Sequence, residues 1–207
     1  MDCLFLDLLD VTVDDVSGII GPYLRDYLQR RRSPESGLGL ELSYYNGYPK
    51  VVAGDPGRGD VPPSAMEWMD NLVTIFIEDL KSDSLLALAT YVPREEINHL
   101  RVRGVLISAA VFSAKFPYVR EINFLGIPLD VLFSNLDQDE IFPHLQRLCI
   151  TFDRHTKRPS DGGLLKTFLD HLESFGNRLD QLELHKSDHI HPRVREEIRG
   201  MVRELIL

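Results

Sequence analysis

The sequence predicts an α/β fold: a solenoid, or horseshoe, of about seven irregular strand–helix units, with a parallel sheet on the concave face and helices on the convex face. In five places an apolar residue is followed three and five positions later by two more, and the starts of these triplets lie 25, 22, 26 and 34 positions apart. This spacing is typical of leucine-rich repeats, in which one short strand recurs in each repeat. The triplets are Leu72-Ile75-Ile77, Ile97-Leu100-Val102, Val119-Ile122-Phe124, Leu145-Leu148-Ile150 and Leu179-Leu182-Leu184.

Polar residues on one side of each strand favour a solenoid over a doubly wound sheet. A doubly wound sheet is covered by helices on both faces, so its strands are almost continuously apolar. In segment 97–103, His99, Arg101 and Arg103 alternate with apolar residues, and segment 182–185 alternates in the same way. One face of the sheet should therefore meet water or a partner, while the helices cover the other face.

Residues 1–64 are expected to form two degenerate units. Their strands are predicted where leucine alternates with other residues, and their helix where apolar residues lie three to four positions apart. Gly, Pro, Asn and Asp mark the turn and the loop. In order, the predicted elements are a strand at 4–8, one helix over 13–28 kinked at Gly21-Pro22 or two short helices there, a strand at 38–42, a turn at 44–47 and a loop over 53–63.

Residues 65–207 contain the clearer repeats and end in a helical cap, and we expect the whole chain, 1–207, to form a single domain. Pro128 suits the first position of a helix, and Gly176 is well placed to end one. Leu148 lies in the fourth triplet and is expected to be buried between repeats. Besides a short apolar turn at 85–89, helical segments are predicted over 109–116, 129–136, 164–175 and 194–202.

The outward side chains of successive strands should form rows across the sheet. Because neighbouring strands lie about 4.8 Å apart, Glu78 should lie beside Arg103, and Glu121 beside Arg147. These residues either keep the sheet hydrated and in register, or form a protein-binding face, since the concave face of a solenoid is its usual contact surface. The predicted binding face comprises Phe76, Glu78, His99, Arg101, Arg103, Glu121, Asn123, Arg147, Glu183 and His185.

The composition limits the possible partners and compartment. The net charge is −9, which argues against nucleic-acid and anionic-membrane binding. The basic run Arg30-Arg31-Arg32 suits a last helical turn. No apolar stretch is long enough to span a membrane. We expect no signal peptide, because residues 1–4 include no basic residue and the apolar run there is too short. Two distant cysteines, Cys3 and Cys149, indicate a reducing compartment. We therefore expect a cytoplasmic or nuclear monomer with a protein partner.

No group of residues predicts catalysis, a metal or a cofactor. His185, Asp188, His189 and His191 are close enough in sequence to suggest a metal site. Nothing fixes their loop or adds a distant ligand, so a solvated turn before the final helix is preferred. For Cys149, a small neutral strand residue is preferred over a nucleophile. We expect a protein that is not an enzyme and holds no metal or cofactor.

Two Phe-Pro lead-ins, that is, Phe-Pro dipeptides that stand just before a predicted strand, suggest a family. Segments 116–122 and 142–148 share the form Phe-Pro-x-(Val/Leu)-x-x-(Ile/Leu), and 168–184 supplies a matching final repeat. With the closing helix, this pattern resembles the repeat region of fungal F-box/leucine-rich-repeat proteins. The resemblance implies a substrate-recruiting part of a ubiquitin-ligase adaptor. The F-box itself, which begins with a Leu-Pro-x-Glu-type motif, has no counterpart, because the chain contains no Leu-Pro dipeptide.

The sequence therefore favours a non-catalytic protein–protein interaction module. One alternative is a small α/β enzyme with a site at the carboxyl ends of the strands, around Arg103, Asp153 and His185. Another is a truncated fragment without independent function. For an interaction module, Arg101→Ala should leave stability nearly unchanged and weaken partner binding.

Overall fold

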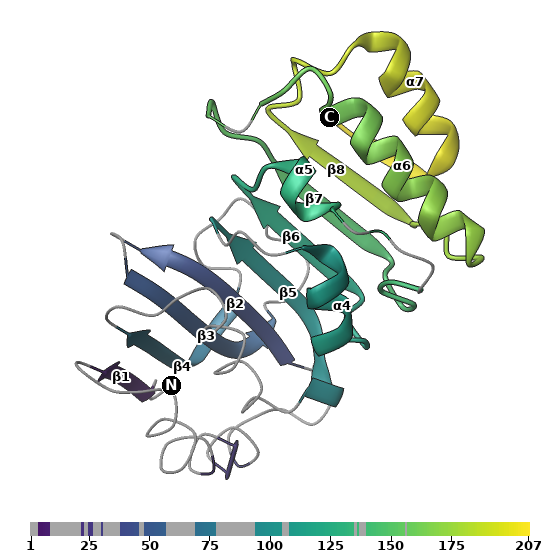
Figure 1. Ribbon diagram of the computed structural model, residues 1–207. Helices are drawn as coiled ribbons and strands as arrows, with labels where there is room; N and C mark the ends of the chain where they lie inside the picture. The colour runs from purple at the N-terminus through teal and green to yellow at the C-terminus, as the bar shows by residue number, and fades with distance from the viewer. Residues whose placement is uncertain are drawn as a thin grey trace. The chain divides into compact units, whose positions relative to one another are not determined.

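The computed structural model describes residues 4–8, 22, 25–26, 30, 38–45, 48–56, 69–77, 94–104, 108–134, 136, 140–155 and 157–207. By its internal contacts the chain separates into two compact units, Met1–Val105 and Leu106–Leu207. Each unit is described by itself (Figure 1). The expectation of a single domain over 1–207 stays a prediction.

The first unit contains a mixed sheet. Strands β2 and β3 form an antiparallel hairpin closed at the pair Tyr45–Tyr48, and β3 pairs antiparallel with β4. Parallel pairing joins β1 to β4 and β2 to β5. A short 3-10 helix, Arg94–Glu96, precedes β5. The strands are β1 (Leu4–Leu8), β2 (Leu38–Tyr45), β3 (Tyr48–Pro56), β4 (Met69–Ile77) and β5 (Ile97–Arg103).

The hairpin overturns the predicted order of strands in this unit. A turn was predicted at 44–47, and Asn46-Gly47 is the strongest short signal for a hairpin. The chain returns along β2 as β3, a strand that was not predicted. Residues 53–56 were assigned to a loop, yet they pair with β4. Seven consecutive parallel units are therefore not found, because β3 is antiparallel to both of its neighbours.

This strand order also changes the predicted rows of side chains. The triplets in β4 and β5 were expected on neighbouring strands, but β4 pairs with β1 and β3, while β5 pairs with β2. The residue opposite Arg103 on β2 is Ser43, and the expected pairing of Arg103 with Glu78 stays a prediction. Glu78 itself, the apolar turn at 85–89 and most of the predicted helix over 13–28 lie outside the described residues.

The second unit confirms the predicted α/β class, with parallel strands alternating with helices. Its strands follow one another in the sheet in chain order, all parallel (Figure 1). They are β6 (Glu121–Leu125), β7 (Arg147–Thr151), β8 (Gln181–His185) and β9 (Glu204–Ile206). The last strand was not predicted, because the final element expected from the sequence was the helix over 194–202.

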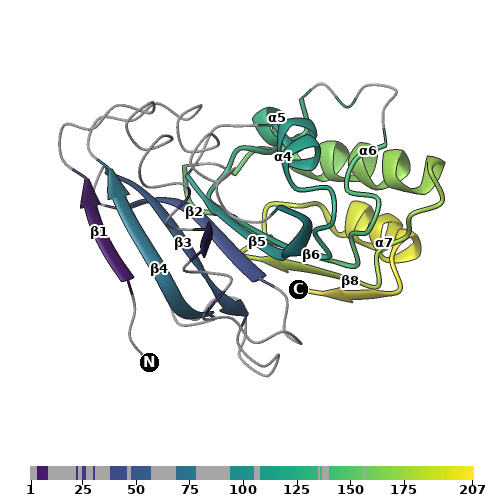
Figure 2. The same cartoon turned by 90° about the horizontal axis from the view of Figure 1, so that it is seen from below.

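The helices of the second unit lie on one side of its sheet, as predicted from the one-sided strands (Figure 2). Their bounds are α4 (Ala109–Lys115), α5 (Leu129–Leu132), α6 (Asp161–Ser174) and α7 (Pro192–Met201). The side chains of the triplets point toward these helices and are buried. The core of this layer includes Phe112, Ile122, Phe124, Leu148, Ile150, Phe168, Leu182, Leu184 and Ile198.

None of the helices in the described part of the chain is long and apolar enough to cross a bilayer.

Candidate functional site

The sheet of the second unit presents one face that no described helix of this unit covers (Figure 2). Because side chains alternate along a strand, the residues between the buried ones point to this side, which we call the open face. Strand register aligns them in three rows. The rows are Glu121, Arg147, Gln181 and Glu204; then Asn123, Cys149, Glu183 and Ile206; then Leu125, Thr151 and His185.

The first row contains polar contacts between neighbouring strands. Arg147 lies 3.2 Å from a carboxylate oxygen of Glu121, which confirms the predicted pair. Gln181 donates to Glu204 at 3.1 Å. Both partners of the ion pair are exposed, so we expect it to contribute less than about 1 kcal/mol to stability. The first row therefore contributes little to stability, and its main effect is on the charges that the open face presents to a partner.

The second and third rows bring three potential metal ligands together. Cys149 Sγ, a carboxylate oxygen of Glu183 and a ring nitrogen of His185 all lie within 4.8 Å of one another. Cys149 and Glu183 are direct register partners on β7 and β8, and His185 lies two residues beyond Glu183 on the same face. Regular strands therefore position all three side chains.

The cluster is partly shielded from solvent. Cys149 is 6% exposed, and the side chains of Glu183 and His185 are 17% and 33% exposed. Between these two, His185 Nε2 lies 3.3 Å from Glu183 Oε2. A thiolate, an imidazole and a carboxylate are the ligand types that zinc takes in proteins, so this arrangement can hold a metal ion.

Sequence reasoning missed this cluster because it considered metal ligands only within one turn. The signal was present in the predicted rows, which already placed Cys149 beside Glu183 and His185 in the next row. Whether Cys149 meets Glu183 and His185 depends on strand register, because a shift of one residue would turn Cys149 to the helix side.

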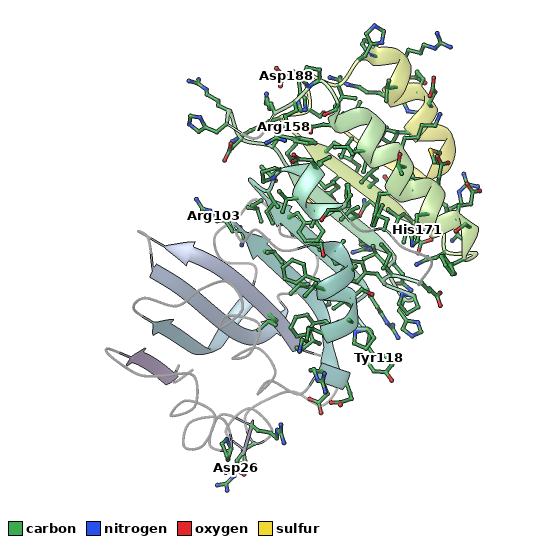
Figure 3. All side chains as sticks on the ribbon, viewed as in Figure 1. Asp26, Arg103, Tyr118, Arg158, His171 and Asp188 are labelled. Carbon is green, nitrogen blue, oxygen red and sulfur yellow. The ribbon has the colours of Figure 1, made fainter. Side chains whose placement is uncertain are left out.

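In the turn with three histidines, where the sequence suggested a metal site, the side chains have separate partners. Asp188 pairs with Lys157 (Asp188 is labelled in Figure 3). His189 lies 2.8 Å from Asp161, and His191 accepts a hydrogen bond from the backbone N–H of Arg193 at the start of α7. The alternative of a solvated turn is wrong for His189, whose side chain is largely buried.

The predicted face residues of the first unit differ in exposure. His99 is half-buried and hydrogen-bonded to Asn98. Arg103 is exposed (Figure 3), whereas Arg101 is only 5% exposed. Phe76 lies on β4, and its side chain is outside the described residues. Burial removes the reason to expect that Arg101→Ala leaves stability unchanged.

The alternative enzyme site invoked Asp153 at the end of β7. Its carboxylate accepts a hydrogen bond from the backbone N–H of His155 at 2.8 Å, which orders the turn after the strand. This contact is structural, so it adds no support for the enzyme alternative.

Comparison of the chain with protein-family models, with curated proteins and with solved structures found no significant match.

Proposed function

We propose that this protein is a non-catalytic interaction module that binds a protein partner on the open face of its second unit. The observation that carries the proposal is a parallel sheet with helices on one side (Figure 2) and with half-buried or exposed polar side chains on the other. A face with ordered, partly shielded polar groups loses little conformational freedom when a partner binds.

The arrangement supports a leucine-rich-repeat-type solenoid as the architecture behind this function. Strands β6 to β9 neighbour one another in chain order, and each intervening segment carries a helix on the same side. Repeat proteins with this construction use their concave, strand-lined face for contact. By its resemblance to F-box relatives, the module would recruit a substrate to a ubiquitin ligase.

The charges of the open face favour a partner that offers basic side chains. Its described residues include the carboxylates of Glu121, Glu183 and Glu204 and a single guanidinium, that of Arg147. Complementary charge raises the association rate and excludes acidic partners, and its effect falls with salt.

The test is affinity capture with two matched charge-reversal variants of the full chain. Glu121→Lys/Glu204→Lys alters the open face, whereas Glu173→Lys/Glu196→Lys alters exposed glutamates of α6 and α7 on the helix side. We expect wild type and the helix-side variant to retain the same proteins and the open-face variant to lose them. Equal capture by both variants would refute a partner on the open face.

A further inference from the structure

We propose that Cys149, Glu183 and His185 form a mononuclear zinc site on the open face. Their donor atoms come from neighbouring strands and lie within 4.8 Å of one another. Strands hold ligands more firmly than loops do, so little rearrangement is needed when the ion enters.

The separation between the histidine and the glutamate fits two ligands of one ion. His185 Nε2 and Glu183 Oε2 are 3.3 Å apart, which is long for a charge-assisted hydrogen bond. Two ligands at about 2.0–2.1 Å from a tetrahedral zinc lie about 3.3 Å from each other. The same geometry places a thiolate about 3.6 Å from either ligand, so small side-chain rotations complete the site.

The donor set selects the metal. Calcium and magnesium bind through oxygen ligands alone, so a thiolate and an imidazole beside a single carboxylate disfavour them. Mixed sulfur, nitrogen and oxygen ligation favours zinc. Three protein ligands leave the fourth position of a tetrahedral ion for water or for a group from a bound partner.

The burial of the three side chains suits ion entry from one side. Cys149 is the most buried, while His185 keeps a third of its side chain exposed. A zinc ion there would replace the contact between His185 and Glu183 with two bonds to the metal. This site does not rest on the proposed protein partner, because the ion binds to the isolated chain.

Cobalt(II) spectroscopy of the purified full chain tests the site. Cobalt(II) reports on zinc sites, because a cobalt–thiolate bond gives a charge-transfer band and tetrahedral geometry gives intense visible bands. Under anaerobic, reducing conditions we expect one equivalent of cobalt(II) to produce both, and zinc to displace it. Wild-type protein that shows no thiolate band at one equivalent overturns the proposal.

Matched variants assign the ligands. Cys149→Ser should abolish the thiolate band, and His185→Gln should weaken cobalt and zinc affinity by about tenfold or more, since even the loss of an outer partner costs that much. Cys3→Ser, which changes the second cysteine of the chain, and His155→Gln, in an exposed turn, should bind as wild type does. A band that survives Cys149→Ser, or that Cys3→Ser removes, contradicts the assignment.

Folding of each variant is checked by circular dichroism. If the buried Cys149→Ser variant does not fold, then His185→Gln and Glu183→Gln decide the question: unchanged affinity in both refutes the site. Protein capture uses Glu121 and Glu204, which are not ligands, so either proposal can fail without the other.

Discussion

The backbone N–H of Phe142 donates a hydrogen bond of 2.6 Å to Ser113 Oγ across 29 residues of sequence. Both residues are buried, and Phe142 has a positive φ of 46°, a backbone conformation that non-glycine residues rarely adopt. Its carbonyl oxygen accepts a second hydrogen bond from Asn177 Nδ2 at 2.9 Å. The second Phe-Pro lead-in is therefore held in place by side chains of two other segments.

Ser113→Ala should destabilise the protein by about 1–3 kcal/mol, because it leaves the buried N–H of Phe142 without its acceptor. Urea unfolding followed by circular dichroism measures this loss. Ser174→Ala is the control, since that exposed hydroxyl bonds only to a carbonyl of its own helix, and it should change the free energy of unfolding by less than about 0.5 kcal/mol. Equal effects would show that the Ser113 contact is dispensable.

Asp161 joins the start of α6 to the turn before α7. Its fully buried carboxylate accepts hydrogen bonds from the backbone N–H of Arg158 and from His189 Nε2, both at 2.8 Å. Asp161→Ala should cost about 2–3 kcal/mol, because hydrogen bonds to charged groups contribute most. Asp170→Ala, at an exposed position of the same helix, is the control. A loss no larger than that of the control would contradict a structural role for this pair.

Leu148 is buried in the middle of β7, where register places it between Ile122 and Leu182. Leu148→Ala should lower the free energy of unfolding by about 2–5 kcal/mol, through lost burial and the cavity left behind. Val111→Ala, at an exposed position on α4, should have an effect near zero. Denaturant titration of both variants compares them, and similar midpoints would mean that β7 is not in a packed core.

Arg101 and Arg103 lie on the same strand but differ in burial. Arg101→Ala should destabilise the protein by about 1–3 kcal/mol, because it removes a buried side-chain stem and a desolvated charged group. Arg103→Ala should be nearly neutral. Thermal unfolding of the two variants tests the contrast; a neutral Arg101→Ala would restore the expectation drawn from sequence.

Lys166 Nζ lies 2.9 Å from Glu197 Oε2 and so links α6 to α7. Its hydrogen bond and positive charge lower the pKa of Glu197 below the ordinary 4.5, and Glu197 in turn raises the pKa of Lys166 above 10.5. Because the pKa of Glu197 is lowered, this carboxylate stabilises the fold when the pH is above 4.5, the ordinary pKa. That contribution is lost as the pH falls through the lowered pKa. Because the pKa of Lys166 is raised, its ammonium group contributes full stabilisation when the pH is below 10.5, the ordinary pKa. That contribution is lost as the pH rises through the raised pKa.

Carboxyl-carbon NMR titration measures this link with two crossed variants. Lys166→Met should raise the pKa of Glu197 toward its ordinary value, only in part, because Arg193 also lies near it. Lys157→Met should instead raise the pKa of Asp188, which a hydrogen bond from Lys157 lowers. Each variant should leave the other carboxyl unchanged, and a shift of both would refute two separate pairs.

The sequence predicted which residues are neighbours on the open face, but it did not predict the candidate metal site. Alternation of polar and apolar residues identified Glu121 and Arg147 as neighbours, and they are. The same alignment placed Cys149 beside Glu183, but a strand residue alone does not indicate a ligand. Whether Cys149 can be a ligand depends on how closely the three side chains approach one another, which only the tertiary structure shows.

The sequence by itself determined that the apolar triplets of the second unit are buried and that its strands run parallel with helices on one side. These properties follow from local periodicity, since a period of two assigns every second side chain to one face. The tertiary structure decided the order of strands in the first unit. Strands of similar apolar sequence can be joined by a hairpin or by a parallel crossover, and the two connections give a strand different partners in the sheet. The tertiary structure also decided the approach of Cys149, Glu183 and His185, because contacts between residues distant in sequence depend on register and packing.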